Sequence, residues 1–276
     1  MGKTAKVVKK IVSLLKTKNV VTLPHIVDEN KMLNGKTAVI VGGTGGIGHA
    51  IAKDFLESGC KVIITGTNQK KMIETLDKFE DVNVKGMVLD LGKTETFNDK
   101  VKEAVSIFGR VDVLVNSGGV HSENIDYWKM SEAEYDRIMD INLKGAFFLC
   151  QAFGKYMRDN AIKGHILLIS SSRGSEPAYS PYGLSKWGLN GMTQGLAKIF
   201  LPHGIIVNAI APGSTATPLL GIKEGDNLYC DENGMERYIV PDEVAVYARM
   251  LVSDVGNVVI GETVHVSAGR GVFDIR

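Results

Sequence analysis

The chain has 276 residues, of which 44% are hydrophobic and 23% are charged, and its formal net charge is +1. These values are close to globular averages and exclude a wholly disordered chain. The balanced charge argues against a nucleic-acid partner, which usually requires a basic excess. No apolar run approaches the ~20 residues of a membrane span, and no secretory signal pattern is present, so we expect a cytoplasmic protein without a membrane span.

The first 34 residues predict a basic N-terminal arm, rich in lysine and without an acidic residue before Asp28. Its apolar residues recur at helical spacing, and they are Val7, Val8, Ile11, Val12, Leu14 and Leu15. We therefore expect a short amphipathic helix that rests on the domain or on a neighbouring subunit. The alternative is a basic face for an anionic partner or a membrane surface.

Residues 35–276 predict one domain in which short β-branched segments alternate with longer amphipathic ones. The expected strands are Thr37–Val41, Lys61–Thr65, Val84–Leu89, Val111–Val115, His165–Ile169, Ile205–Ile210 and Thr263–Val266. Expected helices include Ile47–Ser58, Gln69–Phe79 and Thr94–Phe108. This alternation predicts an α/β fold with a doubly wound parallel sheet of the Rossmann type, with seven strands and helices on both faces. Ligands of such sheets bind beyond the carboxyl ends of the strands.

A glycine-rich segment follows the first expected strand directly. It satisfies GxGxxG at Gly43, Gly45 and Gly48, and it equally satisfies GxxxGxG at Gly42, Gly46 and Gly48. Glycines leave room for a diphosphate, and the N-terminus of the following helix offers free N–H groups. A flexible turn is the alternative interpretation, but the position between strand and helix favours a dinucleotide site.

The second expected strand ends in Thr65-Gly66-Thr67-Asn68-Gln69-Lys70-Lys71, without a carboxylate. NAD sites usually present an acid here for the ribose 2′-hydroxyl, and an acid would repel a 2′-phosphate. The segment therefore favours NADP over NAD, although it also lacks an arginine and the two lysines could be a solvated face.

Tyr182 and Lys186 stand four residues apart near the start of an expected helix, so they share a face. An ammonium beside a phenol can favour the phenolate and support proton transfer. The preceding strand ends in Ser170-Ser171-Ser172, whose hydroxyls can bind a substrate oxygen, with the choice among them uncertain by one position. The three cysteines are widely spaced without CxxC, so we expect reduced thiols and no metal site.

Taken in chain order, these motifs resemble the short-chain dehydrogenase/reductase family, compact type, over roughly residues 34–271. The residues that carry the resemblance are Gly42, Gly46, Gly48, Asp90, Asn116-Ser117-Gly118-Gly119, Asn142, Ser171, Tyr182, Lys186 and Pro212-Gly213. The resemblance implies an NAD(P)-dependent oxidoreductase that moves a hydride between the cofactor and a carbonyl or secondary alcohol. It also implies a homodimer or homotetramer that packs through the long helices before and after the fifth strand.

The resemblance also implies a role for each catalytic residue. Tyr182 is the general acid/base, Lys186 lowers its pKa and holds the nicotinamide ribose, Ser171 orients the carbonyl, and Asn142 anchors a proton-relaying water. Asp90 meets the adenine and Thr217 binds the carboxamide. The full expected cofactor set is Gly42, Thr44, Gly45, Gly46, Ile47, Gly48, Thr67, Asn68, Asp90, Leu91, Asn116, Ser117, Gly118, Tyr182, Lys186, Pro212, Gly213, Thr215 and Thr217.

Some positions depart from the family pattern. Val41 replaces a threonine, Asn116-Ser117-Gly118-Gly119 replaces Asn-Asn-Ala-Gly, and the interval from Ser171 to Tyr182 is slightly short.

Residues 214–240 predict a substrate lid of mixed apolar and acidic character, and the sequence does not identify the small-molecule substrate. The rival hypothesis is a catalytically silent NAD(P)-binding regulatory or assembly protein. A sugar-nucleotide epimerase or dehydratase needs a larger C-terminal domain than this chain has.

Overall fold

A single seven-stranded parallel sheet forms the centre of the computed structural model, which describes residues 31–122, 126–223 and 225–273. The strands are β1 (Thr37–Val41), β2 (Lys61–Gly66), β3 (Val84–Val88), β4 (Val113–Asn116), β5 (His165–Ile169), β6 (Ile206–Pro212) and β7 (Thr263–Val266). Their spatial order is β3-β2-β1-β4-β5-β6-β7. All seven predicted strands are present, and the predicted doubly wound sheet is confirmed. The helix predicted in the N-terminal arm lies outside the described residues.

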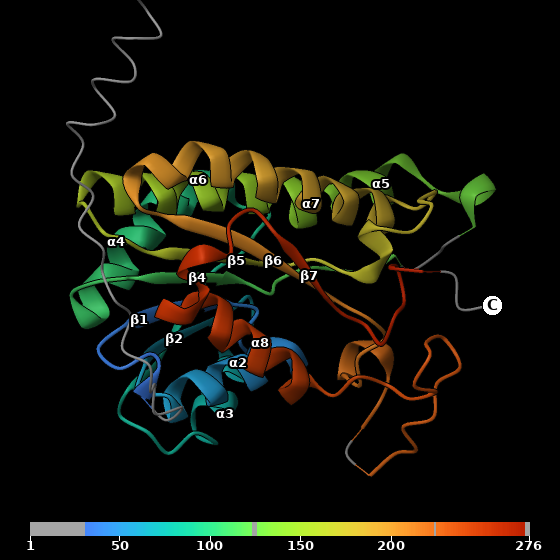
Figure 1. Ribbon diagram of the computed structural model, residues 1–276, viewed down its shortest axis with the longest axis horizontal. Helices are drawn as coiled ribbons and strands as arrows, with labels where there is room; N and C mark the ends of the chain where they lie inside the picture. Colours follow the sequence, from blue (N-terminus) through green and yellow to red (C-terminus); the bar gives the residue numbers. More distant parts are fainter. Residues whose placement is uncertain (1–30, 123–125, 224, 274–276) are drawn as a thin grey trace, which may run out of the picture.

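Helices cover both faces of the sheet (Figure 1). One layer holds α4 (Phe97–Phe108), α5 (Glu132–Met139), α6 (Ala146–Asp159) and α7 (Pro181–Phe200). The opposite layer holds α2 (Gly46–Glu57), α3 (Gln69–Leu76) and α8 (Pro241–Val252). Because both faces are covered, the central strands are mostly hydrophobic, and every residue of β1 and β5 is buried.

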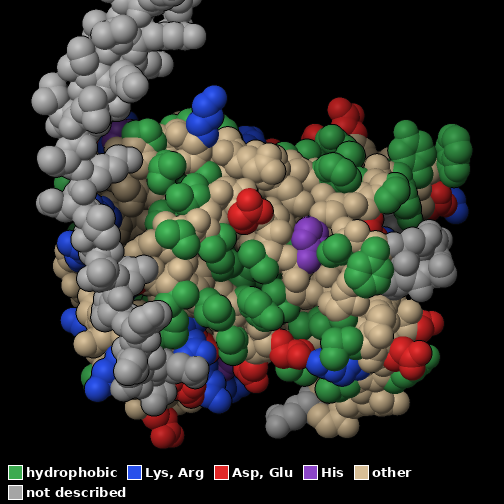
Figure 2. Space-filling model, in the orientation of Figure 1, with side chains coloured by type: hydrophobic (Ala, Val, Ile, Leu, Met, Phe, Trp, Pro, Cys, Tyr) green, Lys and Arg blue, Asp and Glu red, His purple; other side chains and the backbone are tan. Residues whose placement is uncertain are grey.

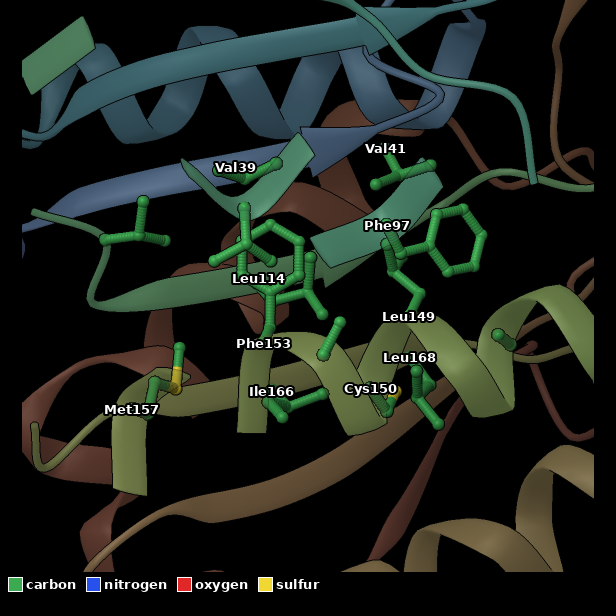
Figure 3. Close-up of a cluster of buried hydrophobic side chains, with 14 of the residues drawn as sticks. Val39, Val41, Phe97, Leu114, Leu149, Cys150, Phe153, Met157, Ile166 and Leu168 are labelled. Atoms are coloured by element: carbon green, nitrogen blue, oxygen red, sulfur yellow. The ribbon is translucent and has the colours of Figure 1, made fainter. Parts of the chain in front are cut away.

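Alternate residues of each strand enter the two cores. Figure 3 shows the first core, in which Val39 and Leu114 of the sheet meet Leu149 and Phe153 of α6. Their neighbours along the strands, such as Ile40, point to the second core under α2 and α8. This period-two alternation fixes each strand's register, because a slip by one residue would exchange the two faces.

The direction of strand order reverses at β1, which pairs with β2 on one side and with β4 on the other. At this point Val41, the last residue of β1, lies opposite Asn116, the last residue of β4. A doubly wound sheet has its crevice at such a reversal, beyond the carboxyl ends of the strands. The reversal therefore places the glycine-rich turn and the loop after β4 at the mouth of the crevice.

Several element boundaries differ from the prediction. Residues Thr94–Thr96 form a 3₁₀ turn before α4, and α3 ends at Leu76 rather than Phe79. Between α5 and α6, residues Asp140–Gly145 form a π-helical segment. Such segments are rare and occur frequently at functional sites. Leu33, which falls within the range predicted for the arm, is fully buried in the second core.

A pH-dependent loss of stability is expected from His165, the first residue of β5. Burial, with the nearby Lys36 charge second, lowers the pKa of His165 from 6.5 to about 4. Between these two pKa values His165 is protonated in the unfolded chain and neutral in the folded chain. The neutral imidazole therefore costs no stability above pH 6.5, and the free energy of unfolding decreases as the pH falls toward 4. The loss from this one group reaches up to about 3 kcal/mol.

Urea unfolding of wild type and His165→Gln at the two ends of this pH window measures the effect. We expect the variant to lose less stability on acidification than wild type. An equal loss in both proteins would assign the acid sensitivity to other groups.

Candidate active site

The turn between β1 and α2 is built for close approach of a ligand. Gly42 has a φ of +75°, a conformation that side chains rarely adopt. A Cβ on Gly48 would lie 2.3 Å from the Gly42 carbonyl oxygen. Gly45 caps α2 without a side-chain hydrogen bond, and the first turn of the helix holds no acidic residue. The helix therefore directs its N–H groups and the positive end of its dipole outward, which fits the diphosphate of a dinucleotide.

The loop after β4 closes one side of this turn. A Cβ on Gly42 would lie 2.9 Å from the Ser117 carbonyl oxygen and 3.0 Å from the Gly118 nitrogen. A Cβ on Gly118 would in turn lie 2.8 Å from the Leu91 side chain. The structure thus brings four predicted cofactor residues from three separate loops together.

Asn116 and Asp90 shape the same loops through their side chains. The Asn116 Oδ1 accepts a hydrogen bond from the Gly118 nitrogen at 3.2 Å. The Asp90 Oδ1 accepts one from the Gly92 nitrogen at 2.9 Å. Both side chains therefore fix the backbone at the carboxyl ends of β4 and β3.

The loop after β6 closes the other side of the turn. A Cβ on Gly46 would lie 2.6 Å from the Thr217 side chain. Pro212 ends β6, and a Cβ on Gly213 would meet the Ser267 backbone at 3.0 Å. The Thr215 hydroxyl donates to the Gly213 carbonyl at 2.9 Å, so it turns toward its own backbone. Thr217 is thus the threonine of this loop that reaches the glycine-rich turn.

At the end of β2, the segment predicted to select the cofactor lies against the same turn. A Cβ on Gly66 would lie 2.9 Å from the Thr44 hydroxyl. Asn68 caps α3, and its Oδ1 accepts from the Lys71 nitrogen at 3.0 Å. Thr67 is exposed beside them. The corner therefore presents hydroxyl and amide groups.

The first turn of α7 places the predicted catalytic pair. The Ser180 hydroxyl accepts from the Gly183 nitrogen at 3.2 Å, and Pro181 occupies the first helical position. Tyr182 and Lys186 follow on one face, with the Lys186 Nζ 5.5 Å from the centre of the Tyr182 ring. The same Nζ donates to the Ile169 carbonyl at 2.9 Å, which ties it to the end of β5.

Geometry distinguishes the three adjacent serines. The Ser170 hydroxyl is buried and donates to the Asn190 Oδ1 at 2.6 Å, which is a structural contact with α7. Ser171 forms a side-chain hydrogen bond with Tyr182. Ser172 is buried at the start of a short 3₁₀ helix. Ser171 is therefore the serine whose hydroxyl meets the tyrosine.

Asn142 lies in the π-helical segment and is held on both ends of its amide. Its Oδ1 accepts from the Val120 nitrogen at 2.8 Å, and its Nδ2 donates to the Val120 carbonyl at 2.9 Å. A Cβ on Gly119 would lie 3.2 Å from the Asn142 Oδ1 and 3.9 Å from the Lys186 Nζ. Asn142 and Lys186 thus face the same point of the loop after β4, and Tyr182 meets that loop nearby at His121.

Burial dominates the electrostatics of the pair. Burial lowers the pKa of Lys186 from 10.5 to about 8. Burial also raises the pKa of Tyr182 above its usual value of 10, against the opposing effects of the Ser171 hydrogen bond and the Arg173 charge. In this structure desolvation outweighs the contributions of Ser171 and Arg173, and the lowering expected from Lys186 stays a prediction. Tyr182 is a neutral phenol at neutral pH.

His121, which lies beside Tyr182, has no role in the sequence-based prediction. His121 stacks on the Tyr182 ring, with centroids 4.1 Å apart and planes at 28°. Burial lowers the pKa of His121, and the charges of Arg173 and Lys186 lower it further, so the imidazole is neutral near pH 7. Nothing in the local pattern around His121 predicted this contact, because it joins the loop after β4 to α7.

No group of three or more His, Cys, Asp or Glu residues in the described part of the chain could hold a metal ion. Cys60, Cys150 and Cys230 are buried free thiols. No helix among the residues that the structure describes is long and apolar enough to cross a membrane.

Comparisons with known proteins agree with this geometry. The family model described as short chain dehydrogenase matches residues 36–226. The chain is 33% identical to an acetoacetyl-CoA reductase of Acinetobacter sp. (strain RA3849), over 86% of this chain and 98% of the relative. It is also 33% identical to glucose 1-dehydrogenase 2 of Bacillus subtilis (strain 168), over 88% of this chain and 97% of the relative.

A solved structure shows the same fold. The 3-ketoacyl-(acyl-carrier-protein) reductase of Brucella melitensis complexed with NADH is similar, with a TM-score of 0.80 and 27% identity over 87% of this chain and 99% of that one. The chain therefore belongs to the short-chain dehydrogenase/reductase family, and it is an NAD(P)-dependent oxidoreductase that acts on CH–OH or carbonyl groups.

Proposed function

We propose that this enzyme reduces a carbonyl compound with Tyr182 as the proton donor and Ser171 as the group that orients the substrate oxygen. The interaction of the Ser171 hydroxyl with Tyr182, which favours the ionised phenol, carries the proposal because it brings two hydroxyl groups together. Lys186 links this pair to the cofactor turn, because its Nζ lies 5.5 Å from the centre of the Tyr182 ring and also approaches Gly119, whose neighbour Gly118 lies against Gly42. One site therefore holds both the proton donor and the dinucleotide cradle.

Each side chain then has a physical task. A bound nicotinamide supplies the hydride. Tyr182 is protonated at neutral pH because burial raises its pKa, so its Oη can donate a proton to the oxygen of the substrate as negative charge develops. Lys186, with a pKa of about 8, can return a proton toward Tyr182. Asn142 holds the loop at Val120 in place and so fixes the wall opposite Lys186.

NADP is the proposed cofactor. No carboxylate occurs between Thr65 and Lys71, so this segment holds no acid that would repel a 2′-phosphate. The Thr44 hydroxyl lies against Gly66, Thr67 is exposed, and Lys70 and Lys71 are exposed at the start of α3. Hydroxyls and positive charge suit a phosphate better than they suit a ribose 2′-hydroxyl alone.

Thermal unfolding in the presence of equal concentrations of NADPH and NADH tests this preference. A tenfold difference in affinity corresponds to about 1.4 kcal/mol of stabilisation, so NADPH should raise the melting temperature more. Thr67→Asp should reverse the order because the new carboxylate repels the phosphate, whereas Thr67→Asn should keep it. Equal stabilisation of wild type by both cofactors would contradict the NADP proposal.

We also propose a cytoplasmic homodimer or homotetramer that acts on a small molecule. Exposed apolar side chains lie on α6 and α7, namely Phe147, Phe148, Leu184 and Trp187. A second group gathers over α8 in the middle of the face shown in Figure 2, namely Val246, Tyr247 and Met250. Patches of this kind favour association. The relatives are named for different substrates, acetoacetyl-CoA and glucose, so we assign this enzyme only the class of carbonyl compounds and their alcohols.

A further inference from the structure

Residues 170–180 connect β5 to α7, and we call them the catalytic loop. Five residues in and around this loop form a cluster of charged and polar groups that we call the charged clamp, namely Arg173, Glu176, Ser214, Glu232 and Arg270. Arg270 Nε donates to Glu176 Oε1 at 2.9 Å, and Arg270 Nη1 donates to the Ser214 hydroxyl at 2.8 Å and also to Glu232. Arg173 Nη1 donates to the other oxygen of Glu176 at 2.8 Å. Positive and negative groups therefore alternate from Arg173 to Glu232.

The clamp joins parts of the chain that are distant in sequence. Arg173 and Glu176 lie in the loop that follows Ser171, and Arg270 lies in the segment after β7. Ser214 and Glu232 belong to the connection after β6. In Figure 1 this connection (orange) and the segment after β7 (red) leave the same edge of the sheet. Arg270 is thus the point at which three loops meet.

Burial distinguishes the central pair of the clamp, Arg270 and Glu176, from an ordinary surface ion pair, whereas the outer members Arg173 and Glu232 are 51% and 48% exposed. The Arg270 side chain is 12% exposed and that of Glu176 is 19% exposed. By contrast, the side chains of Lys102 and Asp99 on α4 are 78% and 80% exposed. Exposed pairs contribute little, whereas removal of one partner of a buried pair leaves an uncompensated charge. Arg270 therefore constrains its neighbours in a way that the α4 pair does not.

The clamp also reaches the catalytic tyrosine. The charge of Arg173 acts on Tyr182 and favours its ionised form. In addition, the Glu176 carbonyl accepts from Trp187 Nε1 at 2.6 Å, and Trp187 lies on α7 with Tyr182. The position of Glu176 therefore affects both the Arg173 charge that acts on the phenol and helix α7, which carries the phenol.

We propose that Arg270 is a positioning residue that holds residues 225–238, in the connection after β6, against the catalytic loop. Through Glu176 it also fixes the position of the Arg173 charge that acts on Tyr182. The kinetic part of this inference rests on the proposed function. The structural part does not, since it concerns only how two loops are held.

Loss of Arg270 has a defined direction of effect on Tyr182. The groups that face the phenol are Ser171 and Arg173 from the catalytic loop, His121 from the loop after β4, and Lys186 from its own helix. Without Arg270, the charge of Glu176 is less neutralised and Arg173 is less firmly placed. Both changes favour the neutral phenol, so the alkaline limb that reports ionisation of Tyr182, as distinct from that of Lys186 with its pKa of about 8, moves to higher pH.

Three variants test the role of Arg270, namely Arg270→Gln, Arg270→Lys and Arg237→Gln. Arg237 is the matched control because it lies in the same connection after β6 as Glu232 and, within the described chain, has no bond to the clamp. Its two terminal nitrogens instead bind Glu243 of α8, at 2.9 and 2.7 Å. For Arg270→Gln we expect the substrate KM to rise roughly tenfold or more, as for loss of a charge-assisted hydrogen bond, and the alkaline limb to shift upward. Arg270→Lys keeps the charge and should recover part of both effects, whereas Arg237→Gln should leave the limb in place.

Amide hydrogen exchange gives a readout without substrate. The Cys230 nitrogen donates to the Glu236 carbonyl at 3.2 Å and the Tyr238 nitrogen donates to the Leu228 carbonyl at 2.8 Å. Both amides should exchange faster in Arg270→Gln than in wild type. If these two amides exchanged at the wild-type rate in Arg270→Gln, Arg270 would not hold the loop, and this result would count even for a protein without measurable turnover. Faster exchange with an unmoved alkaline limb in an active enzyme would overturn the link to Arg173.

Discussion

Tyr182→Phe should lower turnover by about 10²–10⁴-fold while cofactor affinity stays close to that of wild type. The variant keeps the ring that stacks on His121 at 4.1 Å, so the local packing survives. It removes the Oη that hydrogen-bonds Ser171 and that would supply the proton. Loss of a positioned general acid has an effect of this size. Steady-state reduction of a carbonyl substrate and titration with cofactor measure the two quantities separately.

Tyr179→Phe is the matched control for this experiment. Tyr179 precedes α7 by two residues and is 60% exposed, so loss of its hydroxyl should leave turnover unchanged. If Tyr182→Phe turned over at the wild-type rate, another group would have to supply the proton. Equal losses in both variants would point to a general disturbance of the loop before α7.

Gly48→Ala should abolish stabilisation by the cofactor and should itself cost about 1–3 kcal/mol of folding free energy, as overpacking does. The new Cβ would lie 2.3 Å from the Gly42 carbonyl oxygen, and this neighbour is backbone that cannot rotate away. The turn must therefore open, and the N-terminus of α2 loses its place for the diphosphate. Thermal unfolding with and without NADPH measures both effects.

Gly45→Ala provides the comparison for Gly48→Ala. A Cβ on Gly45 would meet only the Gly42 carbonyl oxygen, at 3.3 Å, so the variant should melt near wild type in the absence of cofactor. A Gly48→Ala protein that NADPH stabilised as strongly as wild type would show that the turn does not bind the cofactor.

The sheet could be predicted from the sequence because its signal is local. Each central strand is buried on both faces, so β1 and β5 are short apolar runs that end at glycine or serine. The glycine-rich turn and the spacing of Tyr182 and Lys186 are equally local, because a strand–turn–helix and a single helical turn determine them. Boundaries were less certain, as the 3₁₀ turn before α4 illustrates.

The remaining features of the site depend on tertiary packing. The π-helical segment around Asn142 forms where that side chain bonds the backbone of Val120, 22 residues earlier in the chain. The raised pKa of Tyr182 follows from burial, which no spacing rule contains. The bond between Arg270 and Glu176 joins residues 94 positions apart, and neither has a motif around it. Sequence patterns therefore predict candidate reactive groups, whereas the contacts that hold these groups depend on the tertiary structure.

Transfer of deuterium tests the central claim most directly. Wild-type protein is mixed with NADPH that carries deuterium at the reactive carbon of its nicotinamide, together with a panel of carbonyl compounds, and the products are analysed by mass spectrometry. We predict an alcohol that carries deuterium on the former carbonyl carbon, with one cofactor oxidised for each alcohol formed. Firm cofactor binding with no labelled alcohol from a broad panel of acyl, sugar and cyclic ketones would contradict the account.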